Sequence, residues 1–172
     1  GITQGRLAVD LDPLNPIIKS FFAAVLMFAN DYKTALALSE EILAKDPESY
    51  LGYAGLQLSA FQCNEYDKLI NAESFFLRMY GVKEEIIQEI KRIFNKYDLV
   101  KAYAKMMKHL EEVSEKSPIS PVDMAMRYMI GNQPDKALDW LEKGFELHDP
   151  AMTYITTKMM VFAPLSYNPR FI

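Results

Sequence analysis

The chain has 172 residues, of which half are hydrophobic and 24% are charged, as expected for one folded domain or one short array of stacked units. Its net charge of −4 gives no positive excess for binding nucleic acid or an anionic membrane, and its longest apolar run, Phe21 to Ala29, is far shorter than the roughly 20 residues that span a bilayer. The single Cys63 excludes an internal disulfide, and no signal peptide is visible, so we expect a cytoplasmic protein.

Helical periodicity begins in the first part of the chain. The sequence starts with Gly1 rather than Met, so we expect a piece of a longer protein, with residues 1–13 as the end of a preceding helical unit. Residues 14–47 predict two helices on either side of a polar break at Asn30. The second of these has the 3.6-residue apolar stripe of a half-buried helix, formed by Leu36, Ala37, Ser39, Glu40, Ile42 and Leu43.

Residues 48–81 and 82–118 predict two more helix pairs that are less regular. The first pair has its break at Asn64, and Leu69 follows where the pair before it has the small Ala35. The second begins with a helix over Val82–Lys96. Its following helix has apolar residues spaced by threes and fours, which are Leu99, Tyr103, Met106, Leu110 and Val113.

Residues 119–150 predict a fourth pair, with its break at Asn132. The helix before the break carries Met124, Ala125 and Tyr128, and the helix after it begins with Ala137 and Leu138. Strict alternation of β-branched residues is absent from the whole sequence. The predicted fold class is therefore all-α.

Two kinds of helix boundary recur with the same period. Asp-Pro pairs end at Pro13 and Pro47, and polar breaks occur at Asn30 and Asn64, so both signals repeat after about 34 residues. Asn132 lies two such periods beyond Asn64. Asn tolerates the left-handed conformation that ends a helix, and Pro suits the first turn of the next one. A shared period of this length predicts stacked helix–turn–helix units.

These residues resemble the tetratricopeptide repeat family, whose repeats are 34-residue helical hairpins. The likeness is clearest in residues 14–47 and 119–150, where small residues such as Ala35 and Ala125 sit beside large ones. The resemblance implies a right-handed superhelical solenoid of stacked antiparallel helical hairpins. It also implies that the first helix of each unit lines a concave groove, which in this family commonly holds an extended peptide or a partner helix.

The last stretch, residues 151–172, departs from the period. A solenoid needs a terminal cap because its last hairpin would otherwise expose an apolar face, so we expect this segment to be that cap. It also resembles the end of tetratricopeptide modules found at the C-terminus of bacterial multidomain regulators, including transcriptional activators and nucleotide cyclases. The residues suited to the capping role are Met159, Met160, Val161, Phe162, Leu165 and Phe171.

Catalytic chemistry is not indicated by the sequence. His109 and His148 each lie near a helix end, without the helical His pair of a zinc site. Cys63 is interpreted as a structural thiol, and Gly52 and Gly55 as close-packing positions within a helix rather than a phosphate-binding loop. We therefore expect no enzyme activity, no cofactor and no metal site.

Lysines and arginines gather in the third predicted pair, but acidic residues interrupt them. The basic residues are Lys91, Arg92, Lys96, Lys101, Lys105 and Lys108, and the acidic ones are Glu84, Glu85, Glu89, Glu111, Glu112 and Glu115. This mixture favours solvated helix faces over a surface that binds nucleic acid.

The predicted concave face is apolar. The members of this family that bind chaperones hold a terminal carboxylate with Lys, Arg and Asn side chains on their first helices. In this chain the corresponding positions are occupied by Ser20, Ala24 and Gly55, so the resemblance disfavours an acidic ligand. An apolar, Met-bearing face suits an apolar peptide or an amphipathic helix, although some of its residues must pack in the core between helices. The candidate binding residues are Ile17, Ser20, Ala24, Met27, Phe28, Leu51, Ala54, Leu58 and Phe61.

The sequence therefore predicts a non-catalytic scaffold that binds a protein segment along this face. The alternative is a regulatory or sensory module of a larger signalling protein, a transcriptional regulator or a cyclase, which acts through ligand binding or dimerisation. A homodimer is a second use for such an apolar face, since exposed apolar patches often mark oligomer interfaces.

Overall fold

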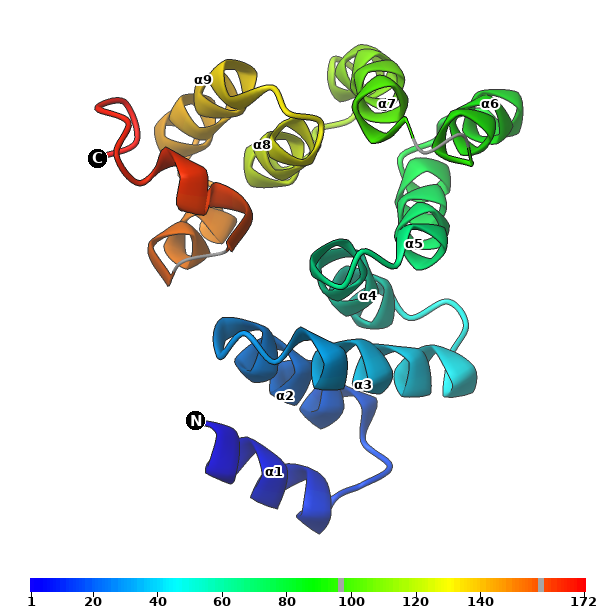
Figure 1. Cartoon of the computed structure of the whole chain (residues 1–172), viewed down its shortest axis with the longest axis vertical. Coiled ribbons are helices and arrows are strands. Elements are labelled where there is room, and N and C mark those ends of the chain that lie inside the picture. The colour runs from blue at the N-terminus through cyan, green and yellow to red at the C-terminus, as the bar shows by residue number, and fades with distance from the viewer. Residues whose placement is uncertain (96–97, 158–159) are drawn as a thin grey trace. The chain divides into compact units, whose positions relative to one another are not determined.

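The computed structural model describes residues 1–95, 98–157 and 160–172, and within these ranges it contains helices and no strand (Figure 1). Lys96 and Met159, assigned above to a helix end and to the cap, lie outside the described residues, as does the side chain of Met160. The helices are α1 (Ile2–Leu11), α2 (Pro16–Phe28), α3 (Tyr32–Lys45), α4 (Tyr50–Gln62), α5 (Tyr66–Met79), α6 (Glu84–Phe94), α7 (Leu99–Ser114), α8 (Pro121–Ile130) and α9 (Pro134–Glu146), followed by the 3₁₀ helices η1 (Pro150–Thr157) and η2 (Met160–Leu165).

The helices form two compact units, Gly1–Phe76 and Leu77–Ile172. In the first unit α1 packs on α2, α2 on α3, and α4 on both α2 and α3. In the second unit α6 packs on α7, α7 on α8, and α8 on α9, with η1 and η2 against α9 and α8. In the part of the chain that the structure describes, no helix is both long and apolar enough to cross a membrane.

Helix starts recur with a nearly constant spacing. The helices α2, α4 and α6 begin at residues 16, 50 and 84, so the interval between successive starts is the same. The helices α3, α5, α7 and α9 begin at residues 32, 66, 99 and 134. The helix α8 begins at residue 121 and breaks the interval of the first set. Within the hairpins, α2 packs on α3, α6 on α7 and α8 on α9.

The turn inside the hairpin is set by a left-handed Asn, as the sequence predicted. Asn30, Asn64 and Asn132 have φ values of 63°, 59° and 55°. In each turn the Asn N–H donates three residues back and the next N–H donates five residues back, as in Asp31 N–H to the Leu26 carbonyl at 2.9 Å. This pair of hydrogen bonds satisfies carbonyls at the helix end that would otherwise lack partners. Tyr32 and Tyr66 add hydroxyl bonds to the Asn30 and Asn64 side chains.

Polar side chains fix where several helices begin. The Asn15 side chain accepts from the N–H of Ile17 at 3.0 Å, and Pro16 occupies the first turn of α2. Asp98 accepts from the N–H of Lys101 at 3.0 Å at the start of α7. Asn and Asp are preferred in this role because they satisfy amides that have no partner within the helix. The turn residues therefore fix the helix boundaries locally.

The core of the first unit lies between α2, α3 and α4. It contains a buried cluster of Phe22, Ala23, Leu26 and Ala35. The predicted close-packing role of the α4 glycines is confirmed, because a methyl group at residue 52 would come within 2.9 Å of two carbon atoms of Leu43. The α4–α5 pair is joined by a buried hydrogen bond of 2.7 Å from the Gln57 amide to the Glu73 carboxylate, and by stacked Tyr53 and Phe75 rings.

The core of the second unit is centred on α8, whose residues are mostly buried. Tyr128 is fully buried, and its hydroxyl donates to the Glu111 carboxylate of α7. Burial, and then the hydrogen bond to Glu111, raise the pKa of Tyr128, so the phenol stays protonated. The Arg127 guanidinium, also buried, lies 5.7 Å from the centre of the Tyr80 ring. The helices α9 and η2 pack on α8.

Candidate interaction surface

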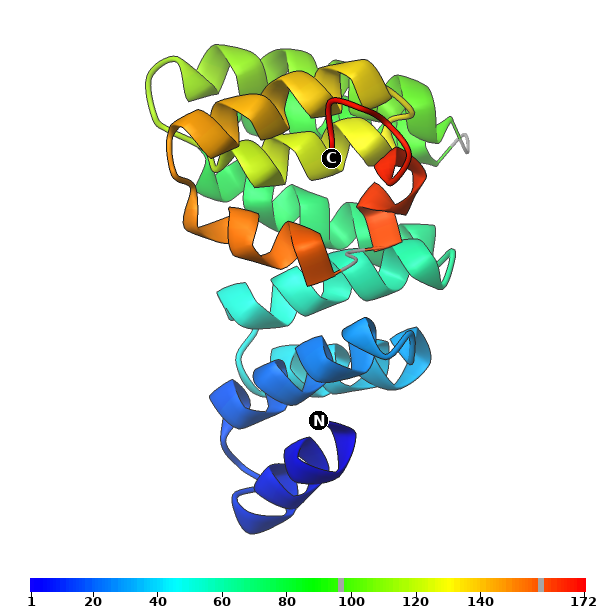
Figure 2. The same cartoon turned by 90° about the vertical axis from the view of Figure 1, so that its left-hand side faces the viewer.

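The nine predicted binding residues lie on α2 and α4, which are neighbours in the first unit, as Figure 2 shows with α3 behind them. None of the nine is buried. Ile17, Phe28 and Leu51 are exposed, and the other six are half-buried. The core residues of these helices are different ones, such as Phe22 and Leu56. We call the nine residues the first-helix face.

The exposed part of α2 and α4 carries no charge over the whole length of both helices, all of which the structure describes. The exposed residues are Pro16, Ile17, Phe21, Phe28, Tyr50 and Leu51. The only charged residue in either helix is Lys19, which is buried and paired with the Glu41 carboxylate. The bond from Lys19 lowers the pKa of Glu41. The exposed apolar residues of these two neighbouring helices therefore form a candidate interaction surface.

The second helices of the same hairpins present charge instead. The exposed residues of α3 include Lys33, Glu40, Glu41 and Lys45. Glu40 and Lys68 form an ion pair of 2.6 Å that joins α3 to α5, and the hydrogen bond to Glu40 raises the pKa of Lys68. Each hairpin of the first unit therefore has an apolar first helix and a charged second helix.

Phe21 belongs to this surface, and the sequence reasoning missed it. It is 67% exposed and lies four residues after Ile17 and seven before Phe28, so the three share one helix face. These spacings were available in the sequence and could have found it. Met27 has a double role, because it also packs against the buried cluster around Phe22.

The predicted cap residues that the structure describes lie in and after η2, which packs on α8. Phe162 and Leu165 are buried, and the half-buried Phe171 ring lies 6.5 Å from that of Phe162. The sequence reasoning did not use Arg170, whose guanidinium donates to the Glu142 carboxylate of α9 through two bonds of 2.8 Å. This interaction lowers the pKa of Glu142. These hydrogen bonds, which we call the Arg170 latch, attach the end of the tail to α9.

His109 lines a cavity of about 460 Å³ in the second unit, together with Tyr80, Lys83 and Lys116. The imidazole Nδ1 lies 3.4 Å from a Glu112 carboxylate oxygen one helical turn away. This pairing orients His109 within its own helix and gives no reason to assign a reaction to it. His148, expected from the sequence near a helix end, directly follows the end of α9 with a φ of 53° and takes the left-handed position that Asn holds in the other turns.

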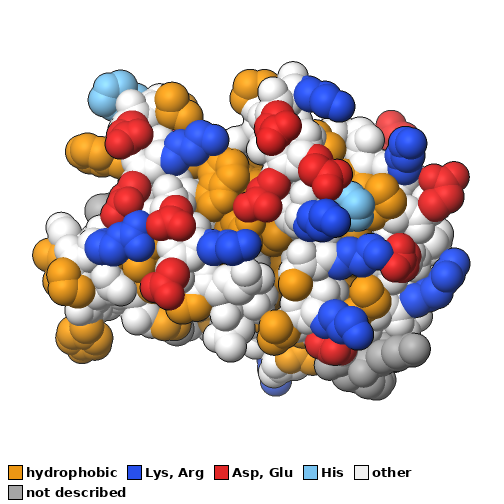
Figure 3. All heavy atoms as spheres, turned by 90° about the horizontal axis from the view of Figure 1, so that it is seen from above, with side chains coloured by type: hydrophobic (Ala, Val, Ile, Leu, Met, Phe, Trp, Pro, Cys, Tyr) orange, Lys and Arg blue, Asp and Glu red, His pale blue; other side chains and the backbone are white. Residues whose placement is uncertain are grey.

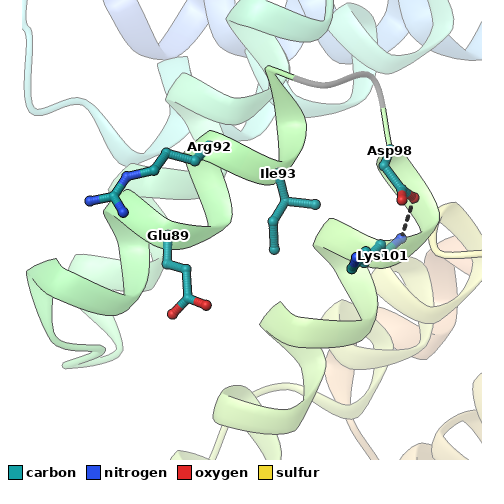
Figure 4. Close-up of a pocket in the computed structure, with 5 residues that line it drawn as sticks. All are labelled: Glu89, Arg92, Ile93, Asp98 and Lys101. Carbon is teal, nitrogen blue, oxygen red and sulfur yellow. Dashed lines mark hydrogen bonds between the residues drawn. The ribbon is translucent and has the colours of Figure 1, made fainter.

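A smaller cavity of about 240 Å³ lies between α6 and α7 (Figure 4). Its side chains do not converge on one point: Arg92 points away from α7, and Asp98 is bonded to the start of its own helix. Lys105 and Glu89 pair across the same two helices. The face in Figure 3 likewise shows Lys and Arg side chains among Asp and Glu, with hydrophobic side chains between them.

Metal binding and thiol chemistry find no support among the described residues. No group of three or more His, Cys, Asp and Glu side chains in that part of the chain is placed to hold a metal ion. Cys63 is half-buried at the end of α4, and burial raises the pKa of its thiol, which disfavours the reactive thiolate. The apolar first-helix face thus stands out as the candidate site.

Comparisons with models of protein families, with curated proteins and with solved structures found no match for this chain.

Proposed function

We propose that this chain is a non-catalytic interaction module of the tetratricopeptide type, a right-handed solenoid of helical hairpins that binds a segment of a partner protein on the first-helix face. The equal spacing of the starts of α2, α4 and α6 and the left-handed Asn in three hairpin turns support the repeat architecture. Contact between the first helices α2 and α4 supports stacking of successive hairpins in register.

The absence of exposed charge from α2 and α4 is the observation that carries the proposed binding role. A charged partner group placed there would lose its water without gaining an opposite charge, which is costly. An apolar side chain buried in the same place is stabilised by about 1.5–3 kcal/mol. The face therefore selects an apolar or amphipathic segment and disfavours an acidic or basic one.

A comparative capture experiment tests this function. The bait carries either the wild-type sequence or Ile17→Glu with Leu51→Glu, which places two charges on the exposed face. We expect a partner that wild type retains and the double variant loses. Mapping by peptide array should then locate the contact in a segment poor in charge.

The matched control places two glutamates on the second helices. Ala37 of α3 and Asn71 of α5 are both exposed, and each is the sixth residue of its helix, so they occupy equivalent positions. Ala37→Glu with Asn71→Glu should leave capture intact. If all three baits retain the same partner equally, the first-helix face is not the binding site.

The exposed apolar residues of α1 favour the regulatory alternative, in which the module acts through dimerisation. None of its residues is buried, and Leu7 and Leu11 are 57% and 78% exposed. Such residues suit a contact with another folded surface. A concentration-dependent dimer in sedimentation that Leu7→Glu with Leu11→Glu abolishes would favour this alternative over the scaffold.

A further inference from the structure

The three hairpins that turn at an Asn can be aligned residue by residue, counting back from that Asn. Ile17, Leu51 and Ile119 then align, but Ile17 and Leu51 lie within α2 and α4, whereas Ile119 lies two residues before α8. Ser20, Ala54 and Val122 align in the same way, as do Ala24, Leu58 and Met126. The second unit thus has counterparts of the first-helix face, with Val122 and Met126 on α8 and Ile119 just before it.

These counterparts in the second unit are buried, whereas the face in the first unit is open. Ile119, Val122 and Met126 are 5%, 3% and 4% exposed. The equivalent Ile17 and Leu51 are 56% and 44% exposed. The aligned residues are therefore buried in the hairpin of α8, and exposed or half-buried in the hairpins of α2 and α4.

The tail packs against α8, the helix that carries Val122 and Met126. Figure 1 shows η2 beside α8, on the side of α8 that faces away from α7, and the two pack together. Val161, Phe162 and Leu165 of η2 are 6%, 1% and 3% exposed. The sequence of η2 includes no charged side chain. The tail thus shows which chemistry a first-helix face of this chain accepts.

Resting on the proposed function, we propose that the open face on α2 and α4 binds a short uncharged partner segment with aliphatic and Phe side chains, in the way that η2 binds α8. The sizes agree. Ile17 to Ala24 spans about 10 Å of α-helix, and a six-residue 3₁₀ segment such as η2 spans about 12 Å. Since α2 and α4 present no exposed charge, a tail-like segment leaves no ionic group buried without a partner.

A peptide with the sequence of residues 160–168, blocked at both ends and labelled with a fluorophore, is the probe. It is titrated with the full chain and followed by fluorescence anisotropy. We expect saturable binding, weakened at least tenfold by Ile17→Glu with Leu51→Glu and unchanged by the control Ala37→Glu with Asn71→Glu. A peptide with Phe162→Asp should not bind. Because all four substituted protein positions are exposed, circular dichroism should show intact folding.

A second peptide separates this inference from the proposed function. It has the sequence of α6, Glu84–Phe94, an amphipathic helix with charged residues on one side. If this peptide binds the first-helix face and the tail peptide does not, the tail-like chemistry is wrong and the interaction module stands. If the tail peptide binds all variants equally, or binds none, the inference is overturned. A dimer of the chain that Ile17→Glu with Leu51→Glu abolishes would make a second copy, and not a separate partner segment, the occupant of the face, and would overturn the inference.

Discussion

Gly55 of α4 lies against Ser39 of α3, so closely that a methyl group at residue 55 would overlap the Ser39 hydroxyl oxygen. Ser39 is buried, and its hydroxyl donates to the Ala35 carbonyl at 2.9 Å, so it has little freedom to move. We expect Gly55→Ala to destabilise the chain by up to about 2 kcal/mol, because overpacking costs about 1–3 kcal/mol and outweighs the gain of about 1 kcal/mol in helix propensity. Chemical denaturation measures this change in unfolding free energy.

The double variant Ser39→Ala with Gly55→Ala tests whether this contact is the cause. With the hydroxyl removed, the new methyl would lie 3.5 Å from the carbon at residue 39, an ordinary contact. The double variant should therefore be at least as stable as Ser39→Ala alone, and the coupling should be about 0.5–3 kcal/mol. Additive effects of the two substitutions would place the strain elsewhere.

The left-handed conformation of Asn132 leads to a second prediction. A β-branched residue is poorly tolerated at its φ of 55°, whereas Gly adopts this region without cost. We expect Asn132→Val to lower stability by about 1–2 kcal/mol, and Asn132→Gly to leave it unchanged or slightly raised. Thermal unfolding of the two variants checks this order. Equal losses in both would show that the Asn side chain, rather than the backbone, determines the turn.

These positions show what the sequence determines locally. The Asn turns, the helix caps and the α4 glycines were predictable because each depends on a backbone conformation or a close approach that few residue types allow. The all-helical class followed from apolar spacing in the same way. The left-handed conformation of His148 was not predicted, because His is a less usual choice for such a turn than Asn or Gly.

The candidate site was only partly predictable, since exposure depends on packing. The 3.6-residue period places Ile17 and Phe22 on different faces of α2, but only the structure shows that the first is open and the second buried. The period alone did not show that Phe21 is exposed while the adjacent Phe22 is buried. The latch from Arg170 to Glu142 joins residues 28 positions apart, and no local pattern in the sequence predicts it.

The ion pair between Arg78 and Glu84 leads to a prediction about acid. The Arg78 guanidinium donates to the Glu84 carboxylate at 2.9 and 3.1 Å, and this bond, followed by that from Gln88, lowers the pKa of Glu84 to about 2. A carboxylate with a depressed pKa stabilises the fold above its unfolded pKa and loses that contribution as the pH falls through its folded pKa. We expect the contact between the end of α5 and the start of α6 to weaken between about pH 4.5 and 2.

NMR titration of the Glu84 side chain measures this value directly. Arg78→Gln should raise the pKa of Glu84 more than Gln88→Ala does, because the bond from Arg78 is the larger cause. An equal rise in both variants would contradict the dominant role of Arg78.

The Arg170 latch gives the last prediction. Its guanidinium binds Glu142 through two bonds and Asp139 at 2.7 Å, and it lies a few residues after the buried Phe162 and Leu165. We expect Arg170→Ala to speed amide hydrogen exchange in η2 while the helices of the first unit keep their protection. Because Arg170 lowers the pKa of Glu142, acid should have the same effect on the wild type as the pH falls through that depressed value. Exchange in η2 that does not respond to the substitution would mean that apolar packing on α8 alone holds the tail.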